Sequence, residues 1–444
     1  MRKLAFLPLL ASLAACGGPP PAPPEGGGWD GWRGQGLLVL ADGDMAATAY
    51  ADGKLYPIGG AADALLRIDP ATGAVTQRLS VPNTVMGWPG SMTVSADGRT
   101  AYVVTSRGSP EPGTQSYDSA YTGMPDADTL TVADLTRGET LSSAVCTRPL
   151  SVDLAPSGAW LLVACGDDAG ELAVVPLTDD GPGGLPGEPR VFDLDVPLLS
   201  ERETDAGASF AVVHPGGAAA GVLLASQGVT LVRFELDAEG VPMRAEAEEP
   251  LVNPGRWLGP ARWMGPGRHL IVADLAWGPK PLDAALNGDG ALVSYALDPD
   301  GEARGETSAA RVSKSPESFA VSPAGNLAAV VNMERTYLPG GVPTGLFRGR
   351  HASSVSLVAV DEAAGTLTTL GAPVRFRGVL PEDAAFDASG RQLAVVVYQD
   401  HAAPRSGGWV TRFRVEGAGA ERRLVETGPR VALPRGAHDL AALD

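Results

Sequence analysis

The sequence has few of the residues on which common catalytic and metal sites depend. Its 444 residues include only five histidines and three cysteines, and 19% are charged. It contains no His-Glu-x-x-His zinc helix, no Cys-x-x-Cys-His haem attachment, no phosphate loop and no Gly-x-Ser-x-Gly elbow. These absences exclude the common zinc proteases, c-type cytochromes, nucleotide hydrolases and serine esterases. We therefore expect no cofactor and no metal site, and we favour a non-enzymatic role.

Two weaker arrangements of polar residues leave some chemistry open. Asp400 beside His401, and His351 near Glu334, have the residue types for acid and base roles. The pairs Asp126 with Asp128 and Asp298 with Asp300 have calcium-ligand chemistry, although isolated Asp-x-Asp pairs are more typical of turns.

Glycine and proline are abundant, at 57 and 38 residues, and they occupy the turns of a repeated sequence phrase. In "SFAVSPAGNLAAVVNMER", residues 318–335, two short apolar runs flank a Pro-x-Gly turn, which predicts a β-hairpin. Similar phrases have turn glycines at Gly53, Gly98, Gly158, Gly217, Gly267, Gly325 and Gly390. The copy around Gly53, residues 47–58, is the loosest. The repeat predicts seven units of about 56 residues.

A second hairpin follows the first in several units, at residues 64–81, 291–307 and 354–370. Four strands per unit, repeated seven times, predict an all-β fold: a seven-bladed β-propeller of four-stranded antiparallel blades. A β-sandwich is the alternative, but sandwiches lack a fixed period of this length. The turns "PAG" and "ADGK" and the phrase "LLRIDPATGAV" resemble the YVTN-type repeat of seven-bladed propellers, a group that includes lactonase-like and surface-layer proteins. The resemblance covers most of residues 46–433 and implies the fold rather than a catalytic set.

The first sixteen residues predict an export signal. Arg2 and Lys3 precede an apolar stretch, residues 4–13, that is too short to span a bilayer. Leu13-Ala14-Ala15-Cys16 resembles the bacterial lipobox, and the resemblance implies lipidation of Cys16 after removal of residues 1–15. An ordinary signal peptide with an incidental cysteine is the alternative. Because Gly17, not aspartate, follows the cysteine, the resemblance favours the outer membrane, and otherwise the periplasm.

The remaining chain divides into a tether and a folded domain. Residues 17–28, "GGPPPAPPEGGG", combine stiff proline with free glycine and have nothing to bury, so residues 16–35 are expected to hold the domain away from the bilayer. The propeller is expected over residues 36–444, with the strands of residues 36–44 and 436–444 meeting at one seam to close the ring.

Cys146 and Cys165 are the other two cysteines. Centring the hairpin of residues 151–165 on Ser157 places Cys165 opposite Pro149, so Cys146 lies only a short bend away. In an exported protein this proximity favours a disulfide, with two buried thiols as the alternative.

The net charge of −18 argues against nucleic acid or anionic lipid headgroups as the main partner. We expect a monomer that contacts the membrane only through its lipid.

Loop lengths indicate which face of the propeller binds. Turns within hairpins are tight, whereas the connections between the second and third strands of a blade are long at residues 106–127, 275–290, 333–353 and 399–408. Long loops gathered on one face of a rigid ring are typical of binding. The candidate binding residues in these loops are Arg107, Glu111, Tyr117, Tyr121, Trp277, Lys280, Glu334, Arg335, Tyr337, Arg348, His351, Asp400, His401 and Arg405. Any single one of them is also consistent with a solvated loop side chain.

A second set of polar residues begins the innermost strands, where it is expected to ring the mouth of the central channel. The set is Glu317, Glu382, Asp383 and His438, with Ser91, Ser151, Ser318 and Asp439 beside them. Their alternative role is hydrogen bonding between blades. Two functions stay open: a lipid-anchored scaffold that binds a protein or an envelope polymer, and a lactonase-like hydrolase with its site at the channel mouth.

Overall fold

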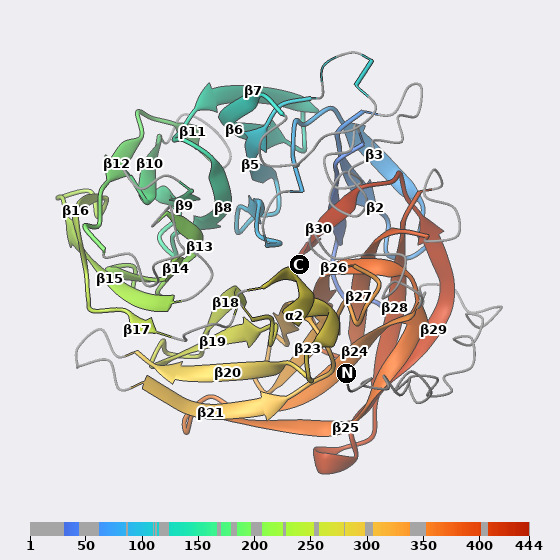
Figure 1. Cartoon of the computed structure of the whole chain (residues 1–444). Coiled ribbons are helices and arrows are strands. Elements are labelled where there is room, and N and C mark those ends of the chain that lie inside the picture. The colour runs from blue at the N-terminus through green and yellow to red at the C-terminus, as the bar shows by residue number, and fades with distance from the viewer. Residues whose placement is uncertain are drawn as a thin grey trace, which may run out of the picture.

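Seven antiparallel sheets are arranged in a ring in the computed structural model of the chain (Figure 1). The structure describes residues 31–43, 62–85, 88–109, 111, 113–114, 124–166, 170–178, 184–196, 207–224, 228–252, 257–278, 280–297, 305–337, 352–400 and 407–443. The predicted signal, Cys16 and most of the tether lie outside these residues.

The strands of each sheet follow one another from the channel outward. Blade 1 contains β30 (Ala437–Leu443), β1 (Gly36–Ala41), β2 (Ala64–Ile68) and β3 (Val75–Leu79). Blade 2 contains β4 (Met92–Val94), β5 (Thr100–Arg107), β6 (Asp126–Asp134) and β7 (Glu139–Ala144). Blade 3 contains β8 (Pro149–Leu154), β9 (Trp160–Cys165) and β10 (Leu172–Thr178), with β11 (Leu185–Pro186) and β12 (Arg190–Phe192) both paired to β10.

The other four blades repeat this order. Blade 4 contains β13 (Ala208–Val213), β14 (Ala219–Leu224), β15 (Gly228–Leu236) and β16 (Pro242–Ala247), with β17 (Leu251–Val252) also paired to β15. Blade 5 contains β18 (Leu258–Met264), β19 (His269–Asp274), β20 (Ala291–Ala296) and β21 (Gly305–Arg311). Blade 6 contains β22 (Pro316–Val321), β23 (Leu327–Asn332), β24 (Ala352–Asp361) and β25 (Thr366–Arg377). Blade 7 contains β26 (Val379–Phe386), β27 (Gln392–Gln399), β28 (Trp409–Glu416) and β29 (Arg423–Ala432). A short helix, α2 (Pro281–Leu286), and a 3-10 turn, η1 (Gly419–Glu421), complete the described elements.

The predicted fold is confirmed, and so are six of the seven predicted hairpin turns. Their glycines have φ between +65° and +89°, a conformation that residues with a Cβ rarely adopt: Gly98, Gly158, Gly217, Gly267, Gly325 and Gly390. The seventh phrase, residues 47–58, lies wholly within residues 44–61, which are outside the described residues. The inner pair of blade 1 consists of β30 and β1, so this phrase does not supply it, and the predicted start of the first unit was wrong.

Blade 1 is assembled from both ends of the chain. β1 pairs with β30 from Gly36↔Leu443 to Ala41↔Ala437, and β2 pairs on its other side (Figure 1). Every residue of β1 is buried, because it lies between two strands and between two neighbouring blades. The predicted closure of the ring at one seam is confirmed.

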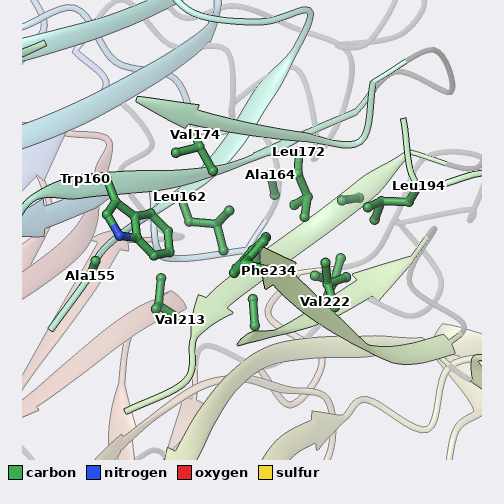
Figure 2. Close-up of a cluster of buried hydrophobic side chains, with 14 of the residues drawn as sticks. Ala155, Trp160, Leu162, Ala164, Leu172, Val174, Leu194, Val213, Val222 and Phe234 are labelled. Carbon is green, nitrogen blue, oxygen red and sulfur yellow. The ribbon is translucent and has the colours of Figure 1, made fainter. Parts of the chain in front are cut away.

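Neighbouring blades pack against each other through apolar side chains on their facing sides. Between blades 3 and 4, Trp160 of β9 packs edge to face against Phe234 of β15, with ring centroids 5.6 Å apart (Figure 2). The Trp160 indole N–H also donates to the Gly240 carbonyl at 3.1 Å. Burial of such large side chains stabilises each contact by about 2–3 kcal/mol per residue, and the repetition of these contacts holds the ring rigid.

The two cysteines of blade 3 form a disulfide. Cys165 pairs with Pro149 across the β8–β9 hairpin, which is the register expected from the turn. Cys146 precedes this hairpin, and its Cα lies 6.1 Å from that of Cys165.

Candidate functional site

The two faces of the ring differ in the length of their connections. On one face, the first and second strands of blades 2 to 7 are joined within a few residues, as at residues 155–159 between β8 and β9. On the other face, the second and third strands of four blades are separated by residues 108–125, 275–290, 333–351 and 400–408. The innermost strands begin on this second face, so the long loops surround the mouth of the channel. We call it the long-loop face.

Two aspartates at this mouth connect neighbouring blades. Asp439 of β30 accepts hydrogen bonds from the Gly90 and Met92 amides at 3.0 Å and from the Ser91 hydroxyl at 3.1 Å. Asp383 of β26 accepts from the Ser318 hydroxyl at 2.8 Å and from the Leu440 amide at 3.2 Å. These contacts give both carboxyl groups a structural role at the seams, which is the alternative that the sequence left open.

His438 is held as a neutral imidazole. Its Nε2 lies 2.8 Å from Oδ1 of Asn83, whose amide nitrogen donates to the Ala41 and Val81 carbonyls. Because those two carbonyls fix the orientation of the amide, Nε2 must carry the proton. Burial lowers the pKa of His438 to about 3, so it remains uncharged at neutral pH.

The carboxyl groups around the mouth are protonated more readily than usual. Burial raises the pKa of Glu317 to about 8 and that of Asp383 to about 7. Burial also raises the pKa of Glu382 well above its ordinary value, and four neighbouring carboxyl groups reinforce the effect: Glu317, Asp383, Asp439 and Asp42. The positive charge of Arg262, on β18, acts in the opposite direction on Asp383 and Asp439. The mouth therefore combines a dense acidic cluster with a cation deeper on an inner strand.

A small, partly open pocket lies at this mouth. Five of its lining residues lie between β3 and β4: Thr84, Val85, Trp88, Pro89 and Ser91. Three innermost strands supply the others, which are Leu150 of β8, Glu382 of β26 and His438 of β30. Glu382 is 2% exposed. Within the described part of the chain, its Oε1 has no hydrogen-bond partner. Of the four predicted channel-mouth residues, Glu382 and His438 thus face one pocket, while Asp383 belongs to the seam.

The predicted loop residues are more dispersed. Arg107 pairs with Asp126, and Asp400 pairs with Arg377 at 2.6 Å. Lys280 and Glu111 are exposed, and the Lys280 amide donates to the Asp283 carboxylate at the start of α2, close to the ring's centre in the view of Figure 1. Arg335 and Tyr337 are half-buried. Six of the predicted residues lie outside the described ranges: Tyr117, Tyr121, Arg348, His351, His401 and Arg405.

Trp277 and Glu334 were expected among the binding residues of the long loops, but both side chains are buried. Trp277 is 5% exposed, and its indole N–H donates to the Ser315 hydroxyl at 2.9 Å. Glu334 is buried and accepts from the hydroxyls of Ser313 and Ser354. Both side chains anchor the bases of long loops, because a loop that leaves a packed sheet needs apolar cover and satisfied polar groups at its root.

Metal-ligand geometry is not found among the described residues, where no group of three or more His, Cys, Asp or Glu side chains could hold an ion. Of the two predicted calcium pairs, Asp298 with Asp300 is not described, while Asp126 pairs with Arg107 and Asp128 accepts from the Arg148 amide.

The sequence reasoning missed Thr84, Trp88, Asn83 and Arg262. The first three lie in the connection between two blades, which reaches the mouth only when the ring closes and brings residue 83 against residue 438. Arg262 lies five residues before the turn glycine Gly267 and was not among the predicted site residues. Its place in an innermost strand was the available signal.

Comparison with known proteins identifies the fold but no family. No protein-family model and no curated protein matches the sequence. A "putative 6-phosphogluconolactonase" from Bacteroides fragilis is similar in structure, with a TM-score of 0.59 and 15% identity over 92% of this chain and 98% of that one. A second protein with this description, from Bacteroides uniformis, gives a TM-score of 0.57 and 15% identity over 92% and 99%. A protein from Lactobacillus plantarum gives 0.54 and 11% over 92% and 100%. At these identities the likeness shows a seven-bladed propeller with lactonase-like structural neighbours.

Among the described residues, no helix has both the length and the apolar character needed to cross a membrane.

Proposed function

We propose that the protein is a lipid-anchored propeller of the bacterial cell envelope that binds a protein or an envelope polymer through its long-loop face. The observation that carries the proposal is the asymmetry of the ring: long connections lie on one face, around a pocket, while on the opposite face the first and second strands of blades 2 to 7 are joined by tight turns. A rigid ring with variable loops on one side is well suited to recognition.

Several donors that the described residues place at the channel mouth are already engaged, which bears on the hydrolysis of an ester. An oxyanion requires donors aimed at open space. The Gly90 and Met92 amides and the Ser91 hydroxyl are all directed to Asp439. The Val85 amide donates to Asp42 at 3.1 Å. These groups support the architecture of the mouth and are not available to a developing negative charge, so binding is favoured over catalysis.

A lactonase-like hydrolase is the second candidate. It is supported by the shared placement of His438 and Glu382 in one pocket and by the two similar structures described as putative 6-phosphogluconolactonases. Hydrolysis of a sugar lactone by the wild type, abolished in His438→Gln, would favour this candidate over the scaffold.

The long-loop face can be tested by site-specific photocrosslinking in cells. A crosslinker at Lys280 or Glu111, both exposed on this face, should give adducts several-fold more abundant than one at Ser157 or Arg137, which are exposed on the opposite face. Adducts would be identified by mass spectrometry. Equal labelling from both faces, or labelling from Ser157 alone, would contradict the proposal.

The anchor is tested separately. Wild-type protein should sediment with membranes and partition into detergent, because an acyl chain on Cys16 adds about 0.8 kcal/mol of membrane affinity per buried CH₂. Cys16→Ser should remain in the aqueous fraction or retain its signal uncleaved. If the two proteins fractionate alike as aqueous periplasmic protein, the lipid anchor is refuted.

A further inference from the structure

The pocket at the channel mouth accepts hydrogen bonds more readily than it donates them. The Ser91 hydroxyl donates to Asp439, and the Thr84 hydroxyl donates to the Arg107 carbonyl at 2.5 Å. The Nε2 proton of His438 is directed to Asn83. Each hydroxyl has a single proton, so the oxygens of Ser91 and Thr84 can only accept from a ligand.

Glu382 makes the same pocket receptive to positive charge. Its Oε1 is buried and has no partner among the described residues, which is a costly state for a polar atom unless a ligand donor satisfies it. The neighbours that act most strongly on it are other carboxyl groups, headed by Glu317 and Asp383. Trp88 adds an aromatic side chain to the lining, and aromatic faces attract cations.

We propose that the channel-mouth pocket binds a primary ammonium group, with Glu382 as its counter-ion and the Ser91 and Thr84 oxygens as further acceptors. An ammonium supplies three donors and one positive charge, which matches an acceptor-rich pocket with a carboxyl group at its wall. The inference rests on the proposed binding function and specifies the chemistry that the long-loop face presents at its centre.

Binding should be coupled to proton release. Burial and the surrounding carboxyl groups raise the pKa of Glu382 and so favour its protonated form in the free protein, whereas pairing with the ammonium requires the ionised form. The titratable groups around it are four carboxyl groups and the imidazole in the same pocket: Glu317, Asp383, Asp439, Asp42 and His438. Arg262 on β18 acts with opposite sign on Asp383 and Asp439. His438 stays neutral, so the proton comes from the acidic cluster. The affinity should therefore rise with pH as Glu382 loses its proton.

The test titrates n-butylamine into the whole protein. Binding is measured by NMR, and proton release is measured by calorimetry in buffers of different ionisation enthalpy. We expect a Kd on the order of 1 mM for a ligand of this size, with one proton released. Butyltrimethylammonium has the same chain but no N–H donor, and it should bind at least about tenfold more weakly. Weak binding that is equal for both cations, or no binding of butylamine, would overturn the inference.

Two variants separate the role of Glu382 from a general effect of charge. Glu382→Gln keeps the shape of the side chain but removes its charge, and it should weaken butylamine binding by about tenfold or more and abolish proton release. Glu139→Gln, on the exposed strand β7 and outside the acidic cluster, is the control and should retain both. Thermal melting verifies that each variant is folded. Unchanged binding by Glu382→Gln would refute the assigned counter-ion.

The source of the ammonium is resolved by a third probe, N-acetyl-lysine methylamide, with its side-chain-acetylated form as control. Binding comparable to butylamine supports a lysine of a partner protein, whereas binding of butylamine alone supports a free amine. If n-butylamine and N-acetyl-lysine methylamide both fail to bind while a crosslinker at Lys280 still labels a partner, the ammonium inference is wrong and the scaffold function stands.

Discussion

Deletion of residues 436–444 is expected to abolish the single cooperative unfolding transition of the protein and to cause aggregation. The deletion removes β30, so the buried strand β1 becomes an open inner edge with unpaired backbone groups. It also removes the buried side chains of Leu440 and Leu443 and the Asp439 acceptor that holds blade 2. The lost burial and hydrogen bonds amount to about 5 kcal/mol or more, which is comparable with the whole stability of many domains.

Calorimetry and light scattering during heating measure this effect. The matched control is a circular permutant in which residues 436–444 precede Gly36 through a short turn. Gly36 already pairs with Leu443, and the Gln35 amide donates to the Leu443 carbonyl at 2.6 Å, so a tight hairpin can join them. The permutant should melt like the wild type. A truncated chain that also melts like the wild type would show that β30 is dispensable and that the ring is closed in some other way.

The fold was predictable because its signals are local. Each hairpin phrase contains its own alternating runs and its own turn glycine, so six turns, and the register of Cys165 against Pro149, follow from a few neighbouring residues. The start of the first unit was not predictable in this way. Residues 47–58 have the same sequence pattern as the other hairpin phrases, but the innermost strand of that blade comes from the opposite end of the chain.

The site was less predictable because its neighbours are distant in sequence. Starts of inner strands identified Glu382 and His438, but their surroundings depend on contacts such as His438 with Asn83 that only ring closure creates. Trp277 was expected on the surface because it follows a strand in a long loop. Its burial depends on Ser315 of the next blade, which no local pattern reveals.

The second large expected effect is a loss of stability as the pH rises from 6.5 to 8. Glu317 has a pKa of about 8 in the folded protein, against an ordinary 4.5, and Asp383 has a pKa of about 7, against 3.8. In this window the unfolded chain has released both protons, whereas the folded protein holds that of Asp383 up to about pH 7 and that of Glu317 up to about pH 8, so a rise in pH favours unfolding. For each carboxyl group that stays protonated across the window, the free energy of unfolding falls by up to about 2 kcal/mol.

His438 does not mask the effect. Its pKa is lowered from 6.5 to about 3, so its contribution to stability is complete above pH 6.5 and is lost only as the pH falls through its unfolded value toward 3. Urea denaturation at pH 6.5, 7.25 and 8 measures the slope. Glu317→Gln removes one titrating group and should reduce the slope by about one proton, whereas Glu139→Gln, on the exposed strand β7, should leave it unchanged. Stability that is constant or increases across this window would show that the carboxyl groups at the channel mouth are already ionised in the folded protein, as they would be if water reached them freely.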